Sequence, residues 1–272
     1  MSAALVGALA IGLVPAGAVT DGAPDGNAHP YVGLMVAYAD EAATQPLWRC
    51  SGTLLSPTVF LTAGHCVEAP AASARVWFDA DVQALTCGLS TAQPAPNCYP
   101  FGGGSSRTGD LEVYPGYNPA AFYLADVGVV VLDSGFNAGA FGALPSVNAL
   151  DKLKNQRGQQ DTTFTAVGYG LQESFPDAAA WKENNVRVRM VAHPKLNQIN
   201  NGYVGDFAMI LSNNAHTGGT CFGDSGGPNF LGTSNVVAGV TSFGKNGNCA
   251  GTGGVFRMDR SGPLNWVQSF LP

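Results

Sequence analysis

The amino-acid sequence predicts an all-β fold of barrels or sandwiches, on the strength of its composition and its pattern of short apolar runs. Glycine is abundant, at 36 of 272 residues, and charged residues make up only 12% of the chain. This composition favours many short strands joined by glycine turns over long charged helices. The apolar runs are rich in Val, Phe or Thr and recur between turn signals, without heptads or a clear internal repeat.

Most of the apolar runs have the length of a β-strand, and one segment at the end of the chain has the pattern of a helix. The expected strands cover residues 31–37, 53–55, 59–62, 74–78, 127–132, 163–167, 186–191, 236–240 and 254–258. Pro263 suits the first turn of a helix over 263–271, and Leu264, Val267 and Leu271 would share one face of it.

Two polar stretches interrupt this pattern. The segment from Cys87 to Cys98 holds Pro94 and Pro96 and is followed by a run of glycines, so we expect a surface loop there. Residues 148–161 are polar and contain lysines, and we expect them to link two halves, residues 19–150 and 151–272.

The first residues predict a secretory signal peptide over 1–18. Residues 3–18 are uncharged and apolar and end in Ala16-Gly17-Ala18, a small-x-small pattern that suits signal peptidase. The alternative is a membrane anchor, but the stretch is short for a hydrocarbon core of about 30 Å and is rich in Ala and Gly. No Lys or Arg precedes the apolar run, which departs from the usual signal-peptide pattern.

Charge and cysteine content narrow the function classes. The formal net charge is −6 and Lys and Arg do not cluster, which argues against nucleic acid as a partner. Hydrophobic residues reach 46%, which excludes a disordered chain. The six cysteines fit disulfides in an oxidising compartment, with the pairing left open by their number alone. Because no Cys-x-x-Cys occurs, a zinc ribbon or a thioredoxin-type site is not expected.

A glycine-flanked serine is the first candidate for chemistry. In Gly223-Asp224-Ser225-Gly226-Gly227-Pro228 the glycines allow a tight turn whose N–H groups could face a substrate oxygen. The alternative is an ordinary glycine-rich turn. The string also satisfies the Gly-x-Ser-x-Gly elbow of α/β-hydrolases, but that fold needs a histidine after the serine. All four histidines, His29, His65, His193 and His216, precede Ser225, so this alternative is excluded.

Two further motifs complete a resemblance. Cys50-Ser51-Gly52-Thr53-Leu54-Leu55 and Leu61-Thr62-Ala63-Gly64-His65-Cys66, together with the serine motif, resemble the trypsin/chymotrypsin family of serine endopeptidases, in a secreted bacterial-type form. Family members carry an aspartate that opens an apolar strand between the histidine and the serine. Asp126 fits that position, and Asp133, which closes the same run, is the competitor.

The resemblance implies two antiparallel six-stranded β-barrels with the active site between them and a short C-terminal helix. It implies that Ser225 is the nucleophile, His65 the general base and Asp126 the residue that orients it. The N–H groups of Gly223 and Ser225 would form the oxyanion hole. No metal or cofactor is implied.

The resemblance also implies the disulfides Cys50–Cys66 and Cys221–Cys249, while Cys87–Cys98 follows by elimination and closeness. It places a pocket for the substrate side chain around Gly219, Thr220, Phe222, Ser242, Phe243, Gly244 and Gly254. Without a carboxylate at its base, Gly219, this pocket predicts a chymotrypsin-like preference for large apolar side chains. A carboxylate from elsewhere, such as Asp259, is the alternative that would change this preference.

In this family a freed α-amine pairs with the aspartate before the serine, here Asp224. Cleavage after Ala18 would expose Val19 for that role, with Ala18 itself as the close alternative, and no separate zymogen step is then needed. The expected protein is a secreted monomer that acts on protein or peptide substrates and has no stable membrane association after signal cleavage. A non-catalytic binding module on the same scaffold is the alternative function.

Overall fold

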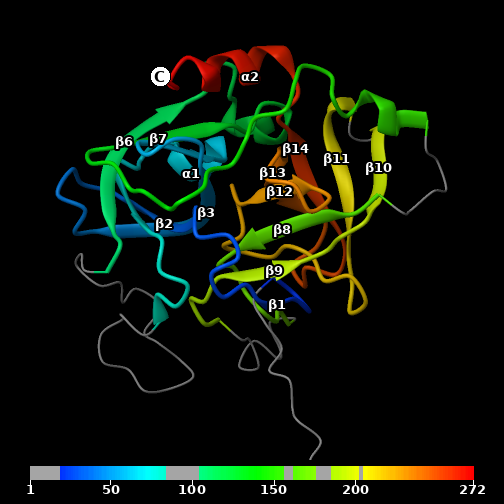
Figure 1. Ribbon diagram of the computed structural model, residues 1–272, viewed down its shortest axis with the longest axis horizontal. Helices are drawn as coiled ribbons and strands as arrows, with labels where there is room; N and C mark the ends of the chain where they lie inside the picture. The colour runs from blue at the N-terminus through cyan, green and yellow to red at the C-terminus, as the bar shows by residue number, and fades with distance from the viewer. Residues whose placement is uncertain (1–18, 84–103, 156–161, 176–184, 202–204) are drawn as a thin grey trace, which may run out of the picture.

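The computed structural model describes residues 19–83, 104–155, 162–175, 185–201 and 205–272 (Figure 1). The expected signal peptide and the expected Cys87–Cys98 bridge lie outside these residues. The strands are β1 (Ala23–Pro24), β2 (Val32–Tyr38), β3 (Pro46–Leu54), β4 (Val59–Thr62), β5 (Ser73–Trp77), β6 (Arg107–Val113), β7 (Gly128–Leu132), β8 (Phe164–Gly168), β9 (Met190–Ala192), β10 (Leu196–Asn201), β11 (Gly205–Asn213), β12 (Pro228–Leu231), β13 (Val237–Gly244) and β14 (Gly251–Arg257). The helices are α1 (Gly64–Val67), α2 (Ser261–Gln268) and the 3₁₀ helices η2 (Pro119–Leu124) and η3 (Asp151–Asn155).

The first half of the chain forms a closed barrel with the strand order β2-β3-β4-β7-β6-β5. Every neighbouring pair in it is antiparallel, and β2 is buried along its whole length. Large side chains such as Leu34, Phe60 and Trp77 fill the core. A barrel leaves no open strand edge, so it provides a rigid base for the residues at its rim.

The second half forms an eight-stranded antiparallel sheet with the order β1-β9-β8-β12-β13-β14-β11-β10. Its edge strand β1 comes from the N-terminal segment, where Ala23 pairs with Val191 of β9. In Figure 1 the first barrel lies on the left, this sheet lies on the right, and α2 runs across the top. The predicted all-β architecture of two barrel-like halves with a short C-terminal helix is confirmed, but the second half is an eight-stranded sheet and not the expected six-stranded barrel, because β1 and further strands extend it.

The C-terminal helix α2 follows the second sheet in sequence but packs against the first barrel. The rings of Trp266 and Tyr114 meet edge to face with their centroids 5.5 Å apart. Leu264 and Val267 are buried, as the expected apolar face of this helix requires. The helix begins at Ser261 and ends at Gln268, so Leu271, expected on that face, lies beyond its last turn.

A buried ion pair fastens the N-terminal segment to the second sheet. Nε of Arg189 lies 3.1 Å from Oδ2 of Asp25, and both side chains are fully buried. Arg189 also donates to the carbonyl of Val32 and to the hydroxyl of Tyr169. A buried charge is tolerated only when it is paired and hydrogen-bonded, and these contacts meet that requirement.

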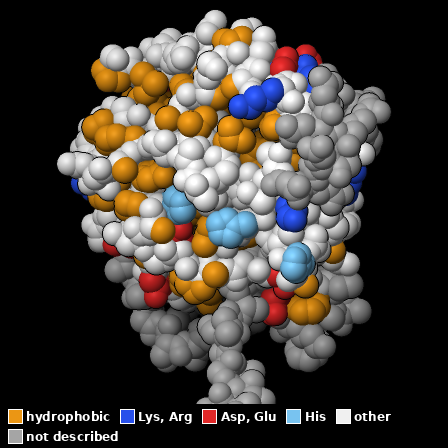
Figure 2. Space-filling view, turned by 45° about the vertical axis from the view of Figure 1, so that its right-hand side comes forward, with side chains coloured by type: hydrophobic (Ala, Val, Ile, Leu, Met, Phe, Trp, Pro, Cys, Tyr) orange, Lys and Arg blue, Asp and Glu red, His pale blue; other side chains and the backbone are white. Residues whose placement is uncertain are grey.

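Two of the expected disulfides are present, Cys50–Cys66 in the first barrel and Cys221–Cys249 in the second sheet. On the face drawn in Figure 2, hydrophobic side chains lie in small groups separated by backbone atoms and by the other side chains drawn in white. Among the described residues, no helix combines the length and the apolar character needed to cross a lipid bilayer.

Candidate active site

The short helix α1 presents His65 at the rim of the first barrel. The strand β4 ends at Thr62, and the chain turns at once into α1, whose Cys66 is bonded to Cys50 of β3. This disulfide holds the helix against the barrel, beside the half-buried imidazole of His65. Cys50, His65 and Cys66 lie close together, but the disulfide leaves neither sulfur available as a thiolate metal ligand.

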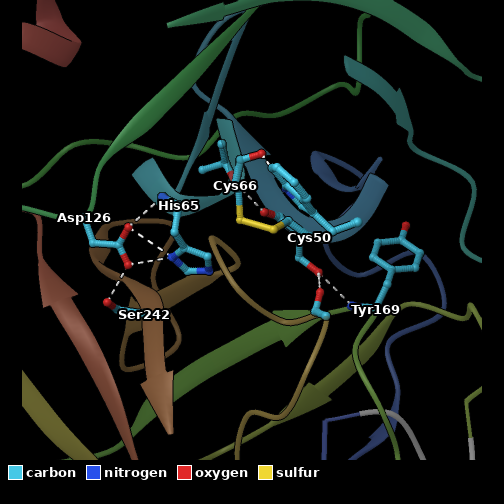
Figure 3. Close-up of a disulfide and its surroundings, with 10 residues drawn as sticks. Cys50, His65, Cys66, Asp126, Tyr169 and Ser242 are labelled. Atoms are coloured by element: carbon cyan, nitrogen blue, oxygen red, sulfur yellow. Dashed lines mark hydrogen bonds and ion pairs between the residues drawn. A yellow bond between two sulfur atoms is a disulfide. The ribbon is translucent and has the colours of Figure 1, made fainter. Parts of the chain in front are cut away.

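Asp126 lies fully buried beside His65 and accepts hydrogen bonds from it (Figure 3). The imidazole Nδ1 lies 2.9 Å from Oδ2 of Asp126, and the backbone N–H of His65 donates to Oδ1 over 3.0 Å. These contacts hold both the ring and its backbone in one orientation. The competitor Asp133 is exposed and accepts a hydrogen bond from Thr108.

Ser242 of β13 donates a hydrogen bond of 2.5 Å to Oδ2 of Asp126, and both residues are labelled with His65 in Figure 3. The two residues are separated by 116 positions, so no local sequence pattern could have revealed this contact. We expected Ser242 only as a residue of the substrate pocket. In the structure it also joins the buried carboxylate of the first barrel to the second sheet.

His65 and Ser225 line a shared cleft of about 720 Å³. Its walls come from both halves of the chain, with Trp48 and Arg49 on the first and Phe222 and Phe243 on the second. The ring of Phe122 meets the imidazole edge to face at 5.4 Å, which adds an apolar wall beside His65. Sequence reasoning missed Phe122, which lies in the 3₁₀ helix η2 just before Asp126.

Two backbone N–H groups of the serine turn are available to bind a ligand. Among the described residues, neither the N–H of Gly223 nor that of Ser225 has a hydrogen-bond acceptor, whereas the N–H of Gly226 donates to the carbonyl of Thr241. Gly223 has φ +95°, a conformation that side chains disfavour. Since Gly223 and Ser225 both line the cleft, their N–H groups can bind a developing negative charge there.

Asp224 points away from the cleft and is buried. Its carboxylate accepts hydrogen bonds from the N–H groups of Gly170 and Cys221, at 2.8 and 2.9 Å. Burial raises the pKa of the Asp224 carboxyl from 3.8 to about 7, against the opposing effects of these hydrogen bonds and of the charge on Arg49.

The expected substrate-pocket residues divide into two groups. Thr220, Phe222, Ser242, Phe243 and Gly244 line the cleft. The buried Gly219 and Gly254 are not among its lining residues.

Neighbouring side chains fill the space beside both glycines. The side chain of Asn213 lies where a Cβ on Gly219 would point, and the ring of Phe243 does the same at Gly254. Nδ2 of Asn213 donates to the carbonyl of Thr220 over 2.8 Å. The side chain that fills the space beside Gly219 is therefore an uncharged amide.

Asp259 does not reach this cleft, so the alternative that it supplies a pocket carboxylate is wrong. Its side chain is fully buried and pairs with Arg257 at 2.8 Å. It also accepts a hydrogen bond from the backbone N–H of Leu150. Asp259 therefore ties the segment between the two halves to β14.

Aromatic side chains extend the apolar surface beside the cleft. The ring of Tyr123 lies 6.1 Å from that of Phe243 and 6.0 Å from that of Phe207. Tyr123 is 41% exposed, so this surface faces solvent. No local sequence pattern predicts this aromatic group, because Tyr123, Phe207 and Phe243 lie far apart along the chain.

The segment that begins at Val19 lies against the second sheet. Val19 is fully buried with Met190 and Ala192. The next residue, Thr20, accepts a hydrogen bond from the N–H of Gly219 at 3.0 Å. The structure therefore places the segment from Val19 beside Gly219, whereas the described hydrogen bonds of the Asp224 carboxylate come from Gly170 and Cys221.

The two-barrel fold and a buried aspartate–histidine pair at the cleft define a chymotrypsin-like serine peptidase. The trypsin family model matches residues 27–260, which is most of the chain. The chain belongs to the trypsin family and is a serine endopeptidase by class.

Individual relatives are distant. The chain is 24% identical over 196 residues to trypsin beta of Drosophila erecta, covering 72% of this chain and 68% of the relative. It is equally similar to trypsin alpha of Drosophila melanogaster, at 24% over 196 residues, with 72% and 67% covered.

Two solved structures share the fold. HL collagenase superposes with a TM-score of 0.63 at 20% identity, covering 90% of this chain and 94% of that one. Human heparin binding protein gives a TM-score of 0.60 at 16% identity, covering 91% and 94%.

We expect Gly223→Ala to destabilise the protein more than Gly26→Ala does. Both glycines have positive φ, at +95° and +58°, so each alanine should cost roughly 1–2 kcal/mol in the backbone. At Gly223 a Cβ would also lie 2.8 Å from Nε of Arg49 and 3.0 Å from Cα of Gly170, whereas nothing lies within 4 Å at Gly26. Urea denaturation of both variants measures the difference, and equal losses would show that crowding at Gly223 is unimportant.

Proposed function

We propose that this chain is a secreted serine endopeptidase that cleaves peptide bonds through an acyl-enzyme on Ser225. The observation that carries the proposal is the hydrogen-bonded series from Ser242 through Asp126 to His65, which ends at a cleft that Ser225 also lines. This series supplies an oriented base, and the serine turn supplies the nucleophile. The trypsin-family fold supports peptidase activity in general.

In the proposed mechanism, Oγ of Ser225 attacks the carbonyl carbon of the scissile bond while Nε2 of His65 takes the hydroxyl proton. His65 then gives this proton to the departing amine, and the acyl group stays on Ser225. A water molecule, with its proton taken by His65, attacks the ester and releases the acid. The Asp126 carboxylate keeps the proton of His65 on Nδ1 and stabilises the imidazolium that forms in each step.

The free N–H groups of Gly223 and Ser225 would bind the carbonyl oxygen as it becomes negative. Each such donor contributes about 3 kcal/mol to transition-state stabilisation in serine peptidases. The proposal is supported by the absence of any acceptor for either group among the described residues. Donors that need not break an existing hydrogen bond are already organised for the charged state.

We propose a preference for a large apolar side chain on the acyl side of the scissile bond. The side chain beside Gly219 is the neutral amide of Asn213. The Asp259 carboxylate is paired with Arg257 and is not available to the pocket. Phe222, 57% exposed, stands at the cleft as an apolar contact. The aromatic surface around Tyr123 favours apolar residues further along the substrate.

We further propose that the active chain begins at Val19, produced by signal peptidase during secretion. The buried position of Val19 and the hydrogen bond between Thr20 and Gly219 support a terminus close to Asp224. A free α-amine there would pair with the buried carboxylate, whose described hydrogen bonds come from the backbone N–H groups of Gly170 and Cys221. The disulfides fit an oxidising, extracellular location.

A fluorophosphonate should label Ser225 in the active protein, as peptide mapping of the labelled chain would reveal. Ser225→Ala and His65→Ala should each lower kcat by several orders of magnitude, up to about 10⁶-fold, because the residues act as one unit. The double variant should therefore be little worse than either single variant. Ser269→Ala, at an exposed serine, serves as the control. If the two kcat losses multiply in the double variant, the residues do not act as one unit and the mechanism is contradicted. If the fluorophosphonate leaves the wild-type protein unlabelled, the result favours a binding module.

A panel of peptides that differ only in the residue before the scissile bond tests the specificity. We expect Phe, Tyr, Leu or Met to exceed Ala by roughly 30- to 150-fold in kcat/KM, from about 2–3 kcal/mol of apolar burial. Lys and Arg should be poor, because neither Asn213 nor Asp259 offers a carboxylate beside Gly219 and the Glu68 carboxylate of the cleft already accepts a hydrogen bond from Tyr117. Faster cleavage after Lys or Arg would overturn the assignment.

The stability of the uncleaved chain should fall as the pH rises from about 4 to about 7. When the chain unfolds, the Asp224 carboxyl returns to a pKa of 3.8, whereas in the folded state it keeps its proton up to about pH 7. Its protonated form therefore favours folding at low pH, and this contribution is lost as the carboxyl ionises. The measurement is the melting temperature across this range, in a Ser225→Ala background that prevents self-cleavage.

Asp224→Asn should remove this pH dependence, while Asp133→Asn, at an exposed carboxylate, should keep it. A chain that begins at Val19 should show a weaker dependence, because its α-amine would stabilise the ionised carboxylate. Edman sequencing of the secreted enzyme identifies the true terminus. A start well beyond Gly22, or an unchanged slope in Asp224→Asn, would contradict the proposed ion pair.

A further inference from the structure

We propose that Ser51 is a positioning residue that holds the serine turn in the shape its oxyanion-binding N–H groups require. The inference rests on the proposed roles of Gly223 and Ser225. Ser51 lies on β3 of the first barrel, directly after Cys50, and is fully buried. It does not line the cleft and would not touch substrate, so any effect on the reaction must pass through the turn.

The hydroxyl of Ser51 links segments of the second half that are far apart in sequence. Its Oγ donates to the carbonyl of Gly223 over 2.9 Å and accepts from the N–H of Tyr169 over 2.9 Å. Figure 3 shows Tyr169 facing the strand that carries Cys50. The donor and the acceptor of a single hydroxyl are both used, which alanine cannot reproduce.

The backbone of Ser51 contacts the other side of the same turn. Its N–H donates to the carbonyl of Ser225 over 2.8 Å, and its own carbonyl accepts from Oγ1 of Thr62. Ser51 thus binds the carbonyls of Gly223 and Ser225, and the peptide plane carrying the Ser225 N–H lies between these two anchored points. Ser51 of the first barrel therefore holds both ends of the segment from Gly223 to Ser225.

This restraint matters because Gly223 is conformationally permissive. With φ +95° and no side chain, Gly223 could turn its peptide planes with little steric resistance. The hydrogen bond to its carbonyl fixes the peptide plane between Gly223 and Asp224, whose N–H donates to the carbonyl of Cys221. This fixed plane limits the rotation of the two flanking planes, which carry the N–H groups of Gly223 and Ser225. Donors act in catalysis only when they already point at the position of the developing charge.

Two glycines allow the backbone of the second half to come close to the Ser51 side chain. A Cβ on Gly168 would lie 3.1 Å from Oγ of Ser51, and a Cβ on Gly227 would lie 3.2 Å from its Cβ. The disulfide at Cys50 limits movement of this part of β3 away from the turn. A hydroxyl at this position therefore lies close to the second half and hydrogen-bonds both the carbonyl of Gly223 and the N–H of Tyr169.

The test compares Ser51→Ala with Ser73→Ala. Ser73 is a buried serine of the same barrel whose Oγ donates to the carbonyl of Asp40 over 2.7 Å, away from the turn. We expect Ser51→Ala to lower kcat by about 10- to 100-fold, less than the loss of a whole donor, with KM changed less than about threefold. Ser73→Ala should leave both constants near the parent values.

A second measurement separates positioning from general damage. A peptidyl trifluoromethyl ketone forms a tetrahedral adduct with the serine and places an anionic oxygen at the turn. Its Ki should rise by the same factor as kcat falls in Ser51→Ala, while the Ki of a non-covalent product peptide should stay constant. Ser51→Cys, whose thiol is a weak donor, should recover part of the loss. All assays are run well below the melting temperature of each variant.

The outcomes distinguish this inference from the proposed function. If a fluorophosphonate fails to label Ser225 in the parent, the proposed function fails. If labelling is stoichiometric but Ser51→Ala retains the parent kcat and ketone affinity, the positioning role is wrong. A fall in kcat without a matching rise in the ketone Ki also overturns it, because the loss would then lie outside the oxyanion-binding step.

Discussion

The carboxylate of Asp126 is the group on which the arrangement of this site depends. It is a fully buried charge, and burial of a charge without partners is strongly unfavourable. Its partners come from both halves of the molecule, His65 from the first barrel and Ser242 from the second sheet. The need to satisfy this charge therefore fixes the orientation of the imidazole and, at the same time, the approach of β13 to the first barrel.

Other contacts across the two halves serve the same arrangement. Ser51 reaches from β3 to the turn at Gly223, and Arg189 of the second sheet pairs with Asp25 at the start of the chain. These are directional polar interactions in buried surroundings, where a misplaced partner costs more than in water. The relative position of the barrels is thus set by hydrogen-bond geometry as well as by apolar packing, and the cleft takes its shape from both.

The sequence predicted the fold and the principal side chains of the site through motifs that are local. The strand over 59–62 coincides with β4 because it is a continuous apolar run between turn signals. The strand β6 was missed because Arg107–Val113 is largely polar, and it is held in the barrel by pairing with β5 and β7. The contact of Ser242 with Asp126 and the position of Asn213 beside Gly219 depend on the packing of distant segments, for which one sequence carries no signal.

The two ends of the described chain cross over to opposite halves. The strand β1 near the N-terminus joins the second sheet, and α2 near the C-terminus packs through Trp266 on the first barrel. Neither half can separate from the other until both of these attachments have opened, so partial opening of the cleft region is suppressed. When one peptidase molecule cleaves another, the substrate molecule must first open a segment of its chain. We therefore expect the crossed termini to slow autolysis by slowing this opening.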